Sequence, residues 1–255
     1  MTPTRTMLLV APAILAMSLA PATAGDIVGK VTYGGTPPTP AKITITKDQA
    51  VCGKATHTDE SLIVGADKGI KNVVVHITDP KDGKKMPAPA KAPAVDQNGC
   101  KFVPHVEIVP AGTPIDIVNS DGILHNIHAR SKANGEFNKA QPKFRKVMQE
   151  TFAKPDVVSI KCDVHNWMNG WIIVADHPYY ALSDDSGSFR ITGVPAGTYT
   201  LQYWQEKLGV QTKQVTEPVA RSGRAASQGP SGSRCSDSRK SRRARRFSGS
   251  GRASP

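Results

Sequence analysis

Short runs in which apolar and polar residues alternate, separated by Gly and Pro, constrain the fold of this chain most strongly. Successive side chains of a strand point to opposite faces of its sheet, so this alternation predicts half-buried strands. Many short strands without long helical periodicity are typical of a β-sandwich or barrel. We therefore predict an all-β protein, with one or two helical turns at most in residues 143–152 and strands in residues 26–33, 42–46, 72–78, 106–110, 114–119, 157–162, 170–175, 188–192 and 198–205.

The first 24 residues resemble a secretory signal peptide. Arg5 supplies a positive start, residues 7–19 are apolar, and Ala22-Thr23-Ala24 has the small residues of a cleavage site. An uncleaved anchor is the alternative, but Pro12 interrupts the short apolar run. No other segment approaches the ~20 apolar residues of a spanning helix. We expect a periplasmic or secreted protein with no integral membrane span after cleavage.

Most of the net charge of +12 lies in one segment. From Arg221 to the end there are ten Lys and Arg and one acid, Asp237, and setting this tail and Arg5 aside leaves about +2. The tail, residues 219–255, is rich in Ser, Arg and Gly, a composition that predicts disorder. It is either an interaction tail for anionic surfaces or not the native ending, and we expect no nucleic-acid partner.

Four cysteines remain to be explained: Cys52, Cys100, Cys162 and Cys235. Pairing is the default in an oxidising compartment. Cys52 and Cys100 each adjoin a turn glycine, which suits a surface disulfide between loops, whereas Cys235 lies in the tail. Cys162 is then left unpaired, which indicates that something else, such as a metal ion, occupies it.

The segment 161–170, KCDVHNWMNG, carries the chemistry. Cys162, His165 and Met168 follow at steps of three after a β-branched run, and His125 follows another strand-like segment 37 residues upstream. One thiolate, two imidazoles and a weak axial thioether are the ligands of a blue-copper electron-transfer site. We therefore predict one copper ion held by His125, Cys162, His165 and Met168.

Residues 95–178, about a third of the chain, resemble a cupredoxin. Residues 102–119 and the pair His125-Asn126 look like the plastocyanin pattern, and Cys162-x-x-His165-x-x-Met168 is similar to the amicyanin ligand loop. The resemblance implies a Greek-key sandwich, outer-sphere electron transfer, and an Asn126 that braces the ligand loops by hydrogen bonds. The chain departs from the pattern in having Leu124 where proline precedes the first histidine.

The segments on either side resemble a second, smaller sandwich. The turn-rich hairpin in residues 184–201 is similar to the carboxypeptidase regulatory-like domain, which is immunoglobulin-like. The stiff run PAPAKAP at 87–93 marks a boundary. We predict a signal peptide (1–24), a first part of this sandwich (25–90), the copper domain (91–180), its remaining strands (181–218) and the tail (219–255).

Other residues near the motif have competing interpretations. His128 lies three positions beyond His125 and should point to the opposite face of a strand, and His105 is a surface or bracing residue. Trp167 and Trp171 either form an apolar docking patch around an exposed edge of His165 or simply pack. His57, His76 and His177 are interpreted as structural.

The function expected first is electron transfer by a type 1 copper protein that serves a redox partner protein and is not an enzyme. Two alternatives remain. One is a copper-binding or storage protein that carries no electrons, and the other is a metal-free module that binds carbohydrate or cell wall through the regulatory-like sandwich. No paired His-x-His motif, Ser-His-Asp arrangement or phosphate loop supports catalysis.

Overall fold

The computed structural model describes residues 24–217 and confirms the all-β prediction. Among these residues there is one four-residue helix, α1 (Gln49–Cys52), and no helix long and apolar enough to cross a bilayer. The predicted signal peptide up to residue 23, and the predicted tail with Cys235, lie outside the described residues.

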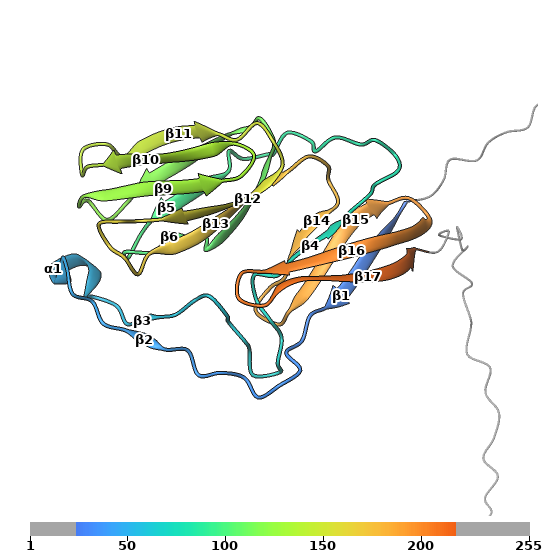
Figure 1. Cartoon of the computed structure of the whole chain (residues 1–255), viewed down its shortest axis with the longest axis horizontal. Helices are drawn as coiled ribbons and strands as arrows, with labels where there is room; N and C mark the ends of the chain where they lie inside the picture. The colour runs from blue at the N-terminus through green and yellow to red at the C-terminus, as the bar shows by residue number, and fades with distance from the viewer. Residues whose placement is uncertain (1–23, 218–255) are drawn as a thin grey trace, which may run out of the picture. The chain divides into compact units, whose positions relative to one another are not determined.

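Two facing sheets form the larger sandwich (Figure 1). Their strand orders are β10-β9-β12-β13-β7 and β11-β8-β5-β6, with β13–β7 and β5–β8 parallel and the other pairs antiparallel. The strands are β5 (Ala94–Gln97), β6 (Phe102–Val103), β7 (Val106–Pro110), β8 (Pro114–Asn119), β9 (His125–Ser131), β10 (Gly135–Gln141), β11 (Val147–Thr151), β12 (Asp156–Lys161) and β13 (Asn169–Ala175).

Alternation along these strands builds the core between the sheets. On β12, Val158 and Ile160 are buried, whereas Val157, which precedes them, is exposed and Ser159 between them is half-buried. Ile115 and Ile117 on β8 are fully buried in the same cluster. The period of two therefore decides which residues enter the core, as the sequence pattern predicts.

A second, smaller sandwich takes strands from both ends of the described chain. Its sheets have the orders β14-β4-β16-β17 and β1-β15, and the chain leaves it after β4 and returns at β14. Ile77, Ile191 and Leu201 lie fully buried in its core. The strands are β1 (Gly25–Lys30), β4 (Val74–Ile77), β14 (Tyr180–Leu182), β15 (Ser188–Val194), β16 (Gly197–Gln205) and β17 (Gly209–Glu217).

An excursion between β1 and β4, here called the arm (residues 41–59), carries α1 and the short pair β2 (Lys42–Ile43) and β3 (His57–Thr58) (Figure 1). Its ends are joined by a hydrogen bond from the Asp59 amide to the Ala41 carbonyl, 2.8 Å. At its far end, Cys52 is disulfide-bonded to Cys100 of the larger sandwich. The expected disulfide is thus formed, but both cysteines are buried, so its prediction as a surface bridge is wrong.

Two local expectations are corrected. Residues 143–152 contain helix-favouring Lys, Met, Gln and Glu, yet 147–151 form strand β11, in which Met148 pairs with Ile117 and is buried. Tertiary burial decides here over local propensity. The predicted strand at 42–46 shortens to Lys42–Ile43, because only these residues find a partner strand.

Adjacent valines on β12 give a matched test of this packing. Val158→Ala should lower the free energy of unfolding by about 2 to 3 kcal/mol, because it removes buried methyl groups and leaves a cavity. Val157→Ala, at a 38% exposed position, should change it by less than about 0.5 kcal/mol. Denaturant unfolding of the metal-free protein measures both, and equal losses would contradict the register described.

Candidate metal centre

A tight loop between β12 and β13 carries three of the predicted ligands. Cys162 follows the last residue of β12, and its amide donates to the Met168 carbonyl at 3.1 Å. The Met168 amide donates in turn to the His165 carbonyl at 2.9 Å, which closes the loop. Gly170 allows the return, since a Cβ there would lie 3.0 Å from the His105 carbonyl oxygen.

The structure brings His125 to this loop from the neighbouring strand β9. Cys162 Sγ lies 3.8 Å from His125 Nδ1 and 3.7 Å from His165 Nδ1, and the two Nδ1 atoms are 3.0 Å apart. All three residues are fully buried. Residues 40 positions apart thus direct one sulfur and two nitrogens at a common point.

These separations fit a single metal ion. The circle through the three donor atoms has a radius of about 2 Å, close to the ~2.0–2.3 Å at which imidazole and thiolate bind a first-row metal ion. A soft thiolate with two imidazoles is a donor set for copper. The geometry and the chemistry of the donors therefore agree.

A carboxylate holds the outer nitrogen of each imidazole. His125 Nε2 lies 2.9 Å from Asp121 Oδ2, and His165 Nε2 lies 2.8 Å from Asp48 Oδ2. Because an ionised carboxylate only accepts hydrogen bonds, each Nε2 carries the proton. Both Nδ1 lone pairs then face each other, and only a cation between them, a proton or a metal ion, makes that approach favourable.

The same contacts shift the acid–base properties of the site. Burial acts to lower the pKa of His125, but hydrogen bonds with Asp121 and Cys162 outweigh it and raise the pKa to about 9. Burial acts to raise the pKa of the Cys162 thiol, yet His125 and the Asn126 amide hold it below its usual value. The Cys162 thiolate is therefore stabilised, which is the form that binds metal.

Asn126 makes the bracing hydrogen bonds that the cupredoxin resemblance implies. Its side-chain oxygen accepts from the amides of Asp163 at 2.7 Å and Val164 at 3.1 Å, and lies 3.3 Å from Cys162 Sγ. Its own amide lies 3.5 Å from the same sulfur. One residue of β9 thus fixes the start of the ligand loop.

Two residues of this arrangement, Asp48 and Asp121, are absent from the sequence prediction. Asp121 lies four residues before His125 and also accepts from the Gly99 and Cys100 amides at 2.6 and 2.8 Å. Its proximity in sequence to a histidine ligand is a usable signal. Asp48 lies 117 residues from His165 and reaches it on the arm, and no sequence pattern predicts that contact.

The other candidate residues lie away from the three donors. His128 points to the opposite face of β9, where its ring contacts Glu136 and Asp163. His105 Nε2 lies 2.5 Å from Glu206, and His57 Nε2 lies 2.8 Å from the Cys52 carbonyl oxygen. Met168 is buried in the same core cluster as Cys162, where its assignment as axial ligand stays a prediction.

The expectation of an exposed His165 edge is wrong. His165 has no exposed surface, because Asp48 of the arm covers its Nε2. Trp167 packs against the His165 ring at 5.2 Å between centroids and donates to the Cys100 carbonyl. Trp171 donates to Glu206 and packs on Trp204, so the two tryptophans serve packing and hydrogen bonding.

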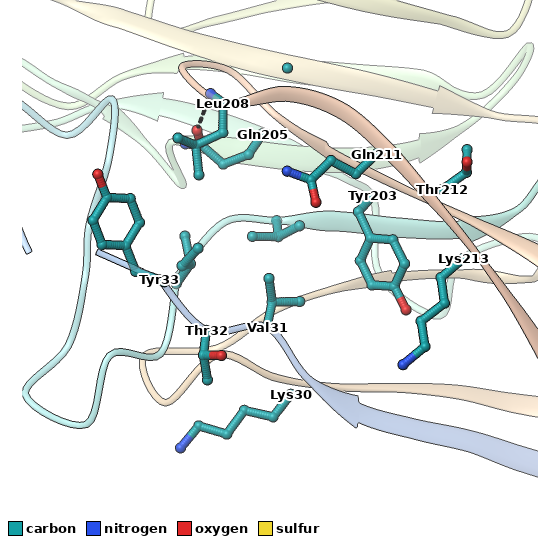
Figure 2. Close-up of a pocket in the computed structure, with 14 residues that line it drawn as sticks. Lys30, Val31, Thr32, Tyr33, Tyr203, Gln205, Leu208, Gln211, Thr212 and Lys213 are labelled. Carbon is teal, nitrogen blue, oxygen red and sulfur yellow. Dashed lines mark hydrogen bonds between the residues drawn. The ribbon is translucent and has the colours of Figure 1, made fainter. Parts of the chain in front are cut away.

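A separate cavity of about 490 Å³ lies in the smaller sandwich (Figure 2). Tyr33, Tyr203, Gln211 and Lys213 line it, and none of the three donor residues does. Gln205 in its wall already accepts hydrogen bonds from the Lys207 and Leu208 amides.

Comparisons with known proteins cover parts of the chain. The family model of polysaccharide lyase family 4, domain II, matches residues 150–225, and no curated protein matches. Among solved structures, amicyanin from Paracoccus versutus is 22% identical over 40% of this chain and 97% of its own, with a TM-score of 0.30.

Two further solved structures are similar over comparable lengths. A purple cupredoxin from Nitrosopumilus maritimus is 19% identical over 32% of this chain and 99% of its own, with a TM-score of 0.29. The copper-containing nitrite reductase of Thermus scotoductus SA-01 is 26% identical, covering 38% of this chain and 26% of its own, with a TM-score of 0.29.

The disulfide gives a test of how the arm is held on the site. Replacing Cys52 and Cys100 together by Ala should lower the free energy of unfolding by about 4 kcal/mol, since the bridge closes a span of 48 residues. Amide exchange in residues 48–53 should accelerate more than exchange in β12. Asp48→Asn, which keeps the disulfide, is the control. Unchanged amide exchange in the double variant would contradict the claim that the disulfide holds the arm on the site.

Proposed function

We propose that this chain is an exported, mononuclear type 1 copper protein that acts in electron transfer, in the periplasm or outside the cell. The observation that carries the proposal is the convergence of His125 Nδ1, His165 Nδ1 and Cys162 Sγ within 3.0 to 3.8 Å of one another. Met168, buried in the same loop, is proposed as the weak axial ligand.

Copper bound there would supply a centre that accepts and releases one electron. The protein's part is to keep the donors fixed in both oxidation states. Asn126 braces the ligand loop, Asp121 and Asp48 orient the two imidazoles, and the core cluster around Cys162 excludes water. Little rearrangement then accompanies the change of charge, which is what a carrier requires.

The two carboxylates favour a carrier over a Cu(I) store. Each negative charge that hydrogen-bonds to a ligand stabilises Cu(II) more than Cu(I), because the interaction grows with the charge of the ion. Asp121 and Asp48 both act in this direction. A store for Cu(I) gains nothing from such groups, whereas a carrier uses them to set its potential.

Copper loading of the mature protein tests the proposal. One equivalent should bind and give the intense visible absorption of a thiolate-to-copper transition, which Cys162→Ala should abolish. Met168→Ala should keep the copper and the band but shift the reduction potential. Copper bound without the band, or reduced only slowly, would favour storage, and no stoichiometric copper would favour the metal-free module.

Asp48 provides a finer test of the carboxylate argument. Asp48→Asn should raise the reduction potential, because it removes a negative charge next to His165. A tenfold loss in the ratio of Cu(II) to Cu(I) affinity corresponds to about 59 mV, and changes around a metal ligand typically cost about 10- to 100-fold. Protein-film voltammetry measures the shift, with the exposed Asp185→Asn as control, and a lowered potential would refute the argument.

A further inference from the structure

The proposed carrier needs a surface through which electrons pass, and the edge of His165 does not provide it. Asp48 covers His165 Nε2, and the arm is fixed by the buried Cys52–Cys100 disulfide. His125, the other imidazole, is also buried, but its chain neighbour Leu124 is 48% exposed. Leu124 therefore gives a short covalent link from a donor residue to the protein surface.

The turn between β10 and β11 lies beside Leu124. Asn119 joins the two segments, since its side-chain amide donates to the Ile123 carbonyl at 2.8 Å and to the Gln141 carbonyl at 3.0 Å. Its backbone amide donates to the Lys146 carbonyl at 2.8 Å. The loop that precedes His125 and the residues that follow Gln141 are thus held together by one buried side chain.

This turn exposes apolar side chains between cations. Phe144 is 81% exposed and Val147 is 50% exposed, and neighbouring exposed apolar side chains of this kind can mark a surface that binds a partner. Lys143, Arg145 and Lys146 are exposed around them, and within residues 24–217 no salt bridge engages these three cations. We call this surface, formed by Leu124 and residues Lys143–Val147, the docking surface.

Two acidic groups near the docking surface accept hydrogen bonds within the protein. Asp121 accepts from His125 and from two backbone amides, and Asp96 accepts from Ser120 and Asn98. The docking surface itself contains three cations and no carboxylate, so the charge that it presents to a partner is positive. Complementary charge steers and orients protein association, while a central apolar contact supplies much of the binding energy.

We propose that the docking surface binds an acidic redox partner protein, one whose Asp and Glu surround an apolar contact, and that electrons pass between this partner and the site beside Leu124. The inference rests on the proposed electron-transfer function. An anionic membrane would also attract an exposed Phe among cations, but a membrane makes no use of proximity to His125, and the redox partner does.

Electron-transfer kinetics test both the positive charge of the docking surface and its position on the route of the electrons. The copper-loaded protein is reduced and then oxidised by hexacyanoferrate(III), at an ionic strength of about 0.1 M, where charges more than about 10 Å away are largely screened. The triple variant Lys143→Glu, Arg145→Glu, Lys146→Glu should react at least tenfold more slowly than the wild type. Hexaammineruthenium(II), a cationic reductant, should in turn reduce the oxidised form of the same variant faster than it reduces the oxidised wild type.

A second triple variant controls for net charge. Lys81, Lys84 and Lys85 are exposed on a loop outside the docking surface, and replacing all three by Glu changes the charge equally. This variant should stay within about threefold of the wild-type rate. Equal slowing of both triple variants, or no slowing of the first, would overturn the inference. The proposed function would still stand if the copper-loaded wild type shows the visible band. An absent band in the wild type would defeat both.

The apolar centre is tested by binding. A peptide that alternates glutamate with leucine, added to the reduced, isotope-labelled protein, should shift the amide resonances of residues 122–124 and 143–147. Phe144→Ser should weaken this binding at least fivefold, whereas Val157→Ser, an exposed valine on β12, should not. Resonance shifts confined to other surfaces would overturn the proposal. So would binding to vesicles of three parts phosphatidylcholine to one part phosphatidylglycerol that is tighter than binding to the peptide.

Discussion

Two imidazole nitrogens, Nδ1 of His125 and of His165, face each other at 3.0 Å beside a buried thiol, and the rest of the site depends on that contact. Carboxylates on both outer nitrogens fix a proton on each, so the two inner nitrogens must share one cation, a proton or a metal ion. Such an arrangement is favourable only around a cation. The geometry therefore suits a cation between the two nitrogens, and the sulfur of Cys162 suits that position to a soft metal.

Each part of the fold contributes one constraint to that contact. The turn from β12 to β13 sets the spacing of Cys162 and His165, and β9 brings His125 and Asn126 alongside. The arm adds Asp48 from a distant part of the sequence, fixed by its disulfide. Asp48 thus covers the imidazole of His165, whereas Leu124, the chain neighbour of His125, is exposed.

The parts of this structure that sequence patterns predict are those set by local periodicity and by ligand chemistry. Alternation predicts the β class and strands such as β8 and β12, and the cysteine–histidine spacing predicts which side chains meet. Residues 143–152 were misassigned because their propensity favours helix, while burial of Met148 against β8 decides for strand. Asp48 is unpredictable because its contact exists only after the arm folds back.

Copper K-edge X-ray absorption of the copper-loaded mature protein tests the central claim most directly. The account predicts a first shell of two imidazole nitrogens and one short thiolate sulfur, with the sulfur lost when Cys162 is replaced. A shell of nitrogen and oxygen alone, or a spectrum unchanged by replacing His125 or His165, would contradict it.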